Sequence, residues 1–223
     1  MTTFQGKTLA DLAVTHPVAS KVFHRHGLDY CCGGRRPMDE ACREAGLEPQ
    51  TVLDEILAAE AAASADGSVV WAQRPLAEII DFIVSHYHAR LRDELPELVA
   101  LADKVESAHA EKPTCPAGLA ELLRQIHAAV LDHLAKEEQI LFPMIRAGEG
   151  RSTAPPIQIM EHEHRDHGAN LERIRGLTAD LVTPPEACAT WQALYLRLDA
   201  FERELMEHIH LENNILFPRA LCE

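Results

Sequence analysis

The fold is decided by a stretch that occurs twice, as DHLAKEEQILFPMI at residues 132–145 and as EHIHLENNILFPRA at residues 207–220. Each copy is a His-x-x-x-Glu followed by Ile-Leu-Phe-Pro. Residues four apart lie on the same face of an α-helix, one turn above the other. Each copy therefore directs one imidazole and one carboxylate the same way.

Both copies continue an apolar stripe with steps of three and four residues, which is typical of a helix packed in a bundle. The two stripes consist of Leu119, Leu122, Ile126, Val130, His133, Glu137 and Ile140, and of Trp191, Leu194, Leu198, Phe201, Leu205, His208, Glu212 and Ile215. A carboxylate on an apolar stripe is costly unless something pairs with it. Two such stripes, each with one histidine and one glutamate, indicate that a metal is the partner.

The composition favours a soluble globular protein. Of 223 residues, 47% are hydrophobic and 25% are charged, both ordinary values. The net charge of −14 argues against binding to nucleic acid or to an anionic membrane. No apolar run reaches membrane-spanning length, and the first residues lack the features of a signal peptide. We therefore expect a cytoplasmic location, where six cysteines stay reduced.

The chain divides into three parts on the pattern of helix signals. Residues 1–63 are expected to form a small helical N-terminal domain that carries Cys31-Cys32, and Thr8 can cap its first helix. Residues 64–74 lack a helical repeat and are interpreted as a linker. Residues 75–223 contain four long helices, the first of which Pro96 should kink or end. The predicted class is all-α, with an antiparallel up-and-down four-helix bundle.

Each helix of this bundle places a histidine on its inward stripe. With the two glutamates they make a set of six: His88, His133, Glu137, His164, His208 and Glu212. Six side chains are too many for one tetrahedral zinc. They suit two six-coordinate ions if Glu137 and Glu212 bridge both, with a shared oxo or hydroxo group and one exchangeable position.

The ligand types favour iron over manganese. The ferritin-like di-iron bundles use Glu-x-x-His and more carboxylates. This set is richer in histidine, which indicates reversible chemistry with small ligands rather than bulk iron oxidation. We therefore predict a non-haem di-iron centre.

Several neighbours of the six are assigned other roles. Glu163 is either a second-shell or transient iron ligand or part of a solvated helix face. His167 is interpreted as a core or second-shell residue, and Tyr87 as a packing residue. Four residues lie off the stripes and are expected at the surface: Glu138, His86, His162 and His210.

Adjacent cysteines between a tyrosine and two glycines indicate accessible thiols on a flexible turn. Cys31 and Cys32 are therefore redox candidates, able to bind iron, to oxidise, or to pass electrons or sulfur. A disulfide between neighbours would be strained and easily reduced. The alternative is that the two thiols only pack in a small core.

The repeated motif resembles the hemerythrin-like domain. The longer runs EKPTCPAGL, KEEQILFPMI, PPEACATW and LENNILFPRAL are similar to the RIC family, di-iron proteins for repair of iron centres, and HPVASKVFHRHGLDYCCGG resembles the N-terminal module of that family. The resemblance covers nearly the whole chain. It implies the same six residues as di-iron ligands, and a role in restoring iron–sulfur clusters damaged by nitric oxide or peroxide.

The favoured hypothesis is a protein that repairs, or supplies iron to, damaged iron–sulfur clusters, rather than an enzyme. An iron held by four histidines and two bridging carboxylates could leave when a bridge is protonated or reduced. Two alternatives stay open: a nitric oxide reductase fed with electrons by the cysteines, and a carrier or sensor of O2 or nitric oxide. Expected partners are damaged cluster proteins and these small ligands, and exposed thiols leave a homodimer open.

Overall fold

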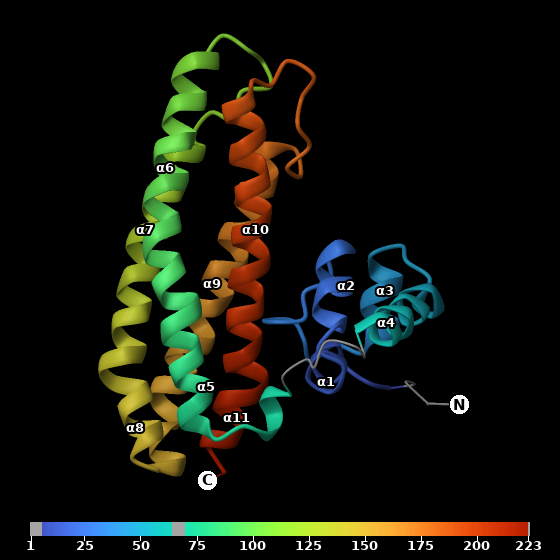
Figure 1. Cartoon of the computed structure of the whole chain (residues 1–223), viewed down its shortest axis with the longest axis vertical. Helices are drawn as coiled ribbons and strands as arrows, with labels where there is room; N and C mark the ends of the chain where they lie inside the picture. The colour runs from blue at the N-terminus through green and yellow to red at the C-terminus, as the bar shows by residue number, and fades with distance from the viewer. Residues whose placement is uncertain (1–5, 64–69, 223) are drawn as a thin grey trace.

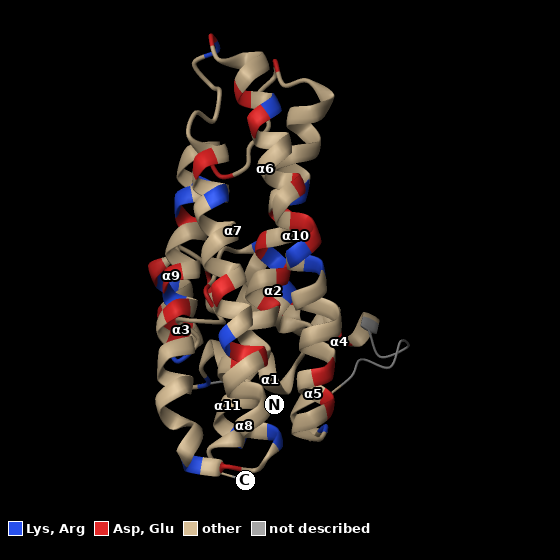
Figure 2. Cartoon of the chain, turned by 90° about the vertical axis from the view of Figure 1, so that its left-hand side faces the viewer, with Lys and Arg blue, Asp and Glu red and all other residues tan. Residues whose placement is uncertain are grey.

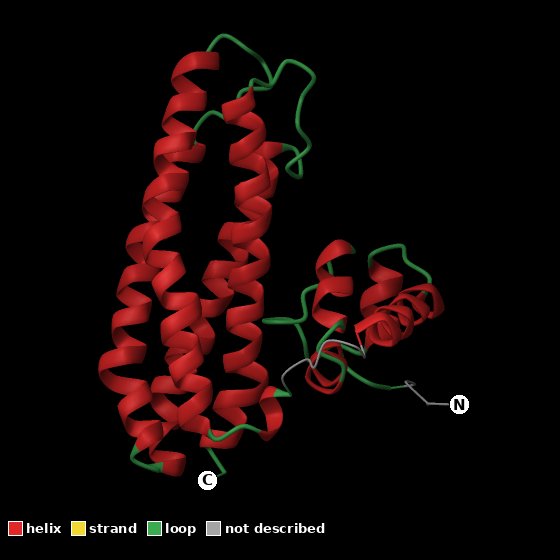
Figure 3. Ribbon diagram, viewed as in Figure 1, coloured by secondary structure: helices red, strands yellow, loops and turns green. Residues whose placement is uncertain are grey.

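The computed structural model describes residues 6–63 and 70–222. Within these ranges the chain is built of helices and forms no strand (Figure 3). The predicted all-α class is confirmed.

The N-terminal unit consists of four helices. They are α1 (Leu9–Thr15), α2 (Ala19–Arg25), α3 (Met38–Glu44) and α4 (Pro49–Ala63). Thr8 caps α1 as expected, because its hydroxyl accepts from the Asp11 amide while the Asp11 carboxylate accepts from the Thr8 amide. Gly34 lies so close to the carbonyl of Tyr30 that a Cβ atom would collide with it. The loop after the two cysteines therefore needs glycine at that position.

The bundle begins at Leu76 and uses ten helical segments, some only a turn long. In chain order these are α5 (Leu76–Phe82), η2 (Ile83–His88), α6 (Ala89–His109), α7 (Leu119–Lys136), η3 (Glu137–Leu141), α8 (Phe142–Arg146), α9 (Ala154–Thr178), α10 (Ala189–Leu211), η5 (Glu212–Leu216) and α11 (Phe217–Ala220). Short 3-10 turns precede α5 and α9, at η1 (Trp71–Gln73) and η4 (Gly150–Thr153). The predicted linker falls partly on residues 64–69, which lie outside the described residues.

Four long helices form the bundle (Figure 1). Around its axis α6 packs on α7, α7 on α9, α9 on α10, and α10 on α6. The inward stripe of α10 is buried as the sequence predicted, with Trp191 and Leu194 fully enclosed. The N-terminal unit lies against the bundle beside α10, with α2 as the nearest helix in the view of Figure 1.

The expectation that Pro96 ends the first long helix near Leu95 is wrong. Helix α6 continues through Pro96 to His109. Proline removes one backbone hydrogen bond from a helix interior, but its ring here faces solvent while Leu95 and Leu98 are buried against the bundle. Packing of the flanking residues therefore outweighs the local cost.

Charged side chains of both signs alternate along the helices on the face that Figure 2 shows. Arg197 bonds Glu94 at 2.7 Å and bridges α10 to α6, and Arg124 bonds Asp103 at 2.6 Å between α7 and α6. Such partly or fully exposed pairs contribute little individually. No helix in the described part of the chain is long and apolar enough to cross a membrane.

Candidate metal centre

At three points of the described bundle an α-helix widens into a π-helical segment, and each point carries candidate ligands. His88 ends η2, Glu137 begins η3, and Glu212 begins η5. In the last two, the proline of Ile-Leu-Phe-Pro has no N–H to offer the carbonyl four residues earlier. The wider turn, which inserts one extra residue into the helix, therefore coincides with the place where an α-helical hydrogen bond is already lost.

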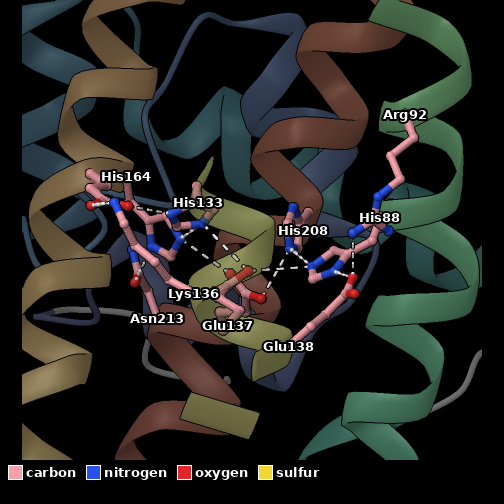
Figure 4. Close-up of polar contacts among 11 residues, drawn as sticks. His88, Arg92, His133, Lys136, Glu137, Glu138, His164, His208 and Asn213 are labelled. Atoms are coloured by element: carbon pink, nitrogen blue, oxygen red, sulfur yellow. Dashed lines mark hydrogen bonds and ion pairs between the residues drawn. The ribbon is translucent and has the colours of Figure 1, made fainter. Parts of the chain in front are cut away.

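The structure brings the six predicted residues into two groups of four. One group is His88, Glu137, His208 and Glu212, and the other is His133, Glu137, His164 and Glu212. In each group one ligand atom from every residue lies within 4.8 Å of all the others. The two glutamates belong to both groups. All six side chains are buried. Figure 4 shows the four histidines and Glu137 pointing toward one another from the helices of the bundle.

Facing ring nitrogens mark the two ends of the site. The Nε2 atoms of His88 and His208 are 3.2 Å apart, and those of His133 and His164 are 3.1 Å apart. Burial lowers the pKa of His88 to about 4 and lowers the pKa of His133 as well. Both rings are therefore neutral at pH 7 and offer lone pairs. Two nitrogens bound at about 2.1 Å to one ion at right angles would be about 3 Å apart.

The carboxylates lie between these two histidine pairs. The Glu137 Oε2 atom is 3.3 Å from His88 Nε2 and 3.5 Å from His133 Nε2. Glu212 places one oxygen 3.0 Å from His208 Nε2 and the other 3.2 Å from His164 Nε2. Each glutamate therefore reaches one histidine of both groups.

Within the described residues neither oxygen of Glu137 has a hydrogen-bond partner. Burial and the neighbouring Glu212 raise the pKa of Glu137 well above its ordinary value. An enclosed carboxylate of this kind is stabilised by a cation. The donor set, its burial and its unsatisfied oxygens fit a pair of metal ions.

The outer nitrogens of three histidines are held by polar side chains. His88 Nδ1 is 2.7 Å from Glu138, which also accepts from Arg92 at 2.8 Å. His133 Nδ1 is 2.9 Å from Glu163, which also accepts from Lys136. His164 Nδ1 is 2.8 Å from the Asn213 side-chain oxygen. These acceptors fix the N–H on Nδ1 and turn each Nε2 lone pair inward (Figure 4).

Three of the four residues expected at the surface are partly or fully buried. Glu138 is half-buried against His88, and His210 is only 8% exposed, with its ring edge on Tyr30. The extra residue of η3 shifts Glu138 off the stripe that a regular helix would give, whereas His210 precedes η5 in α10 and is covered by Tyr30 of the N-terminal unit. His162 is exposed, as expected, and His86 is half-buried on Phe82.

The remaining neighbours pack around the site. His167 is buried with its ring 5.0 Å from that of His133, and neither of its nitrogens has a partner among the described residues. Tyr87 stacks on His208 at 5.3 Å. Both lie where the sequence interpretation put them, in the core beside the six. Glu163 reaches the site through His133 rather than through the inner group.

The two cysteines lie on a loop that touches the bundle. Cys31 is buried, contrary to the expected accessible turn, and Cys32 is half-buried. The Asp29 carboxylate orders the loop by accepting from the amides of Cys31, Cys32 and Gly33. The two sulfur atoms are 3.7 Å apart, and Cys32 Sγ is 3.3 Å from the His164 carbonyl oxygen. Both line a cavity of about 540 Å³ between the N-terminal unit and the bundle.

Two asparagines that the sequence reasoning passed over connect the loop to the bundle. Asn213 donates to the carbonyl of Cys31 at 3.2 Å, and Asn214 donates to the carbonyl of Tyr30 at 3.1 Å. The repeat could have pointed to Asn213, because Asn213 occupies the position that Glu138 has in the other copy.

Comparison with known proteins agrees with this geometry. Residues 53–220 match the family described as the hemerythrin HHE cation binding domain. The chain belongs to this hemerythrin HHE family. The ScdA_N family, described as a domain of unknown function, matches residues 5–60.

Curated relatives match the chain over nearly its whole length. The iron-sulfur cluster repair protein YtfE of Yersinia pseudotuberculosis serotype IB (strain PB1/+) is 48% identical over 219 residues, which cover 98% of each chain. The protein of the same name from Yersinia pestis (strain Pestoides F) is also 48% identical over 219 residues. The resemblance to cluster repair proteins inferred from the motifs is confirmed.

Proposed function

We propose that this protein holds two iron ions and supplies iron to iron–sulfur clusters damaged by nitrosative and oxidative stress. Its 48% identity to proteins named for iron–sulfur cluster repair supports this role. We assign His88 and His208 to one ion, and His133 and His164 to the other. Glu137 and Glu212 would bridge the two. The clients would be proteins with damaged clusters, and nitric oxide or O2 would be small ligands of the centre.

The observation that carries the proposal is the sharing of both glutamates by two four-residue groups. A single ion would leave one histidine pair, with nitrogens only about 3 Å apart, facing itself across a buried space. Imidazole and carboxylate together suit iron better than calcium or magnesium, which prefer oxygen alone. When bound, the iron pair supplies a redox-active centre for small ligands as well as the cargo for repair.

The buried glutamates explain how such a site could both hold and release an ion. Burial and Glu212 raise the pKa of Glu137 in the metal-free protein, so a proton competes with a cation for its oxygens. A proton that returns to Glu137 removes the charge shared by the two groups. His88 and His133 carry no charge that could replace that of Glu137, because burial keeps both rings neutral. Acidification should therefore favour release.

The test is to measure iron content and the Mössbauer spectrum, then iron transfer to a client with a damaged cluster. We expect two coupled irons per chain that restore the client. Glu137→Gln should abolish both retention and repair, whereas Glu149→Gln, which changes an exposed carboxylate, should leave both intact.

Three other results would overturn the proposal in different ways. Two irons that stay bound while nitric oxide is turned over to nitrous oxide would identify a nitric oxide reductase. Reversible binding of O2 or nitric oxide without iron loss would identify a carrier or sensor. A single metal ion, or zinc, would contradict the assignment of the six residues.

A further inference from the structure

The two copies of the repeat differ at one position that touches the candidate site. Glu138 and Asn213 both follow the shared glutamate of their copy. Each accepts from Nδ1 of a histidine on another helix, Glu138 from His88 and Asn213 from His164. The equivalent positions therefore do the same work at opposite ends of the site.

The side chains of Glu138 and Asn213 are held by different partners. Glu138 is fixed within the bundle by Arg92 on α6. Asn213 is fixed from outside the bundle, because its side-chain N–H group donates to the carbonyl of Cys31. The same amide thus joins His164 to the cysteine loop of the N-terminal unit.

A second contact also joins His164 to the cysteine loop. The Cys32 sulfur lies 3.3 Å from the backbone carbonyl of His164. His88 and His133 are held by Glu138 and Glu163, and His208 Nδ1 has no partner among the described residues. Of the four histidines in the described site, His164 is the one whose side chain and backbone both connect to the cysteine loop.

We propose that Asn213 is a positioning residue that couples the redox state of Cys31 and Cys32 to the grip of His164 on its metal ion. This rests on the proposed function, in which His164 binds iron. With both thiols reduced, the loop holds Asn213, and Asn213 holds the imidazole. Oxidation of the pair releases this hold and frees one iron ahead of the other.

The oxidation needs an acceptor, and we assign this part to a low-molecular-weight disulfide that enters the cavity lined by both thiols. The Cys32 thiol loses its proton as its sulfur attacks one sulfur of the disulfide. The displaced thiolate takes up that proton, and a mixed disulfide remains. The Cys31 sulfur then attacks Cys32 and displaces the second thiolate, which takes up the Cys31 proton. Two electrons pass from the cysteine pair to the disulfide, and two small thiols leave.

The geometry makes the link to Asn213 direct. Bonding brings the sulfurs from 3.7 Å to about 2 Å, which closes a small ring around the peptide that joins Cys31 to Cys32. The carbonyl of that peptide is the one that Asn213 binds. Closing the ring reorients this carbonyl and draws Cys32 away from His164. Loss of such an outer partner typically weakens metal affinity on the order of 10- to 100-fold.

Two matched variants test the coupling. Asn213→Asp keeps an oxygen that accepts from His164 Nδ1 but removes the N–H group that donates to Cys31. Asn214→Asp makes the same chemical change one residue away, where the side chain binds the Tyr30 carbonyl and His210 but not His164. Iron release to a ferrous chelator is then timed with the loop reduced, and again after treatment with glutathione disulfide.

In the unchanged protein and in Asn214→Asp, we expect oxidation to speed release of one iron by about tenfold or more. In Asn213→Asp the release rate should not depend on the state of the thiols. The proposal is overturned if Asn213→Asp keeps the full dependence, or if oxidation leaves release unchanged in the parent protein.

A metal-free measurement separates this proposal from the proposed function. In the apo protein, the side-chain ¹⁵N–H resonances of Asn213 should shift when the cysteine pair is oxidised. A shift together with failure to bind two irons would remove the proposed function and leave the coupling standing. Two bound irons without a shift would overturn the coupling alone.

Discussion

At the scale of single residues, the candidate site contains a ligand that lowers the stability of the metal-free fold. Glu137 is fully buried without a hydrogen-bond partner in the described chain, next to a second buried carboxylate. Replacing a buried charged group by a neutral one of similar volume often stabilises a protein. The metal-free fold should therefore be more stable when glutamine replaces this carboxyl group.

Glu137→Gln tests whether the carboxylate lowers stability while it is needed for iron binding. We expect the free energy of unfolding of the metal-free variant to rise by about 1–3 kcal/mol, while iron content falls below two per chain. Urea unfolding of the apo protein and iron analysis of the loaded protein measure the two effects. Glu138→Gln should not stabilise, because that carboxylate is paired with Arg92. A less stable Glu137→Gln would show that the carboxylate has a protein partner.

His210 makes the apo protein sensitive to acid. Burial lowers the pKa of His210 to about 4, so between that value and the ordinary 6.5 the unfolded chain binds the proton more strongly. The stability that the neutral ring contributes is full above pH 6.5 and is lost as pH falls to 4. For one residue this loss amounts to about 3 kcal/mol.

His210→Gln should remove that part of the acid sensitivity, because glutamine does not titrate and can still accept from Asn214. The measurement is the free energy of urea unfolding at pH 7 and at pH 4.5. His162→Gln is the control, since His162 is exposed and should leave the difference between the two pH values unchanged. An unaltered difference in His210→Gln would mean that His210 is protonated in the folded protein.

The six central residues were accessible from the sequence because they lie on regular stripes and two pairs of them repeat. Glu138, Asn213 and His210 were not, since a periodic stripe assumes a constant number of residues per turn. The π segments at Glu137–Leu141 and Glu212–Leu216 break that period at Glu138 and Asn213, whereas His210 precedes η5 and is covered by Tyr30 of the N-terminal unit. Their partners come from other helices or from the N-terminal unit, which spacing along one helix cannot show.

At the scale of elements, the π segments set which side chains face the site. Each inserts a residue between the His-x-x-x-Glu pair and the buried Phe that follows it. Pro143 and Pro218 explain their position, and this signal was present in the sequence. Pro96 carried the same local signal without the same result, since α6 runs through it as an α-helix; all three prolines are exposed, so exposure does not explain the difference.

Deletion of Gln139 tests the role of the π segment. Gln139 is exposed within η3, so its removal should convert the segment to α-helix and leave Leu141 and Phe142 packed as before. Glu138 would then be turned away from His88. We expect helix content by circular dichroism to be kept and iron binding to fall by on the order of 10-fold or more. Full iron content after the deletion would show that the wider turn is not needed.

At the scale of the whole molecule, the N-terminal unit is docked where the candidate site lies. Tyr30 is fully buried, with its ring 6.1 Å from Phe23 within the unit and 5.5 Å from His210 on α10. Its backbone carbonyl accepts from Asn214. The sequence predicted two helical units but not this contact, because docking depends on residues far apart in the chain. Tyr30 is therefore the residue that ties packing of the unit to the position of Cys31 and Cys32.

Two substitutions at Tyr30 separate packing from polarity. The hydroxyl is buried with no hydrogen-bond partner in the described residues, and burial raises its pKa. Tyr30→Phe should thus leave the free energy of unfolding unchanged or raise it by up to about 1 kcal/mol. Tyr30→Ala should lower it by about 3–5 kcal/mol, and alkylation of the buried Cys31 should become faster as the unit loosens.

Urea unfolding and timed alkylation of the thiols measure the two effects. A loss of more than about 1 kcal/mol in Tyr30→Phe would mean that the hydroxyl is hydrogen-bonded, for example to a buried water. If Tyr30→Ala lost stability while Cys31 stayed protected, the ring would support only the N-terminal unit. Faster alkylation with little loss of stability would instead mean that the ring acts mainly at the interface, where the cysteine loop meets His164.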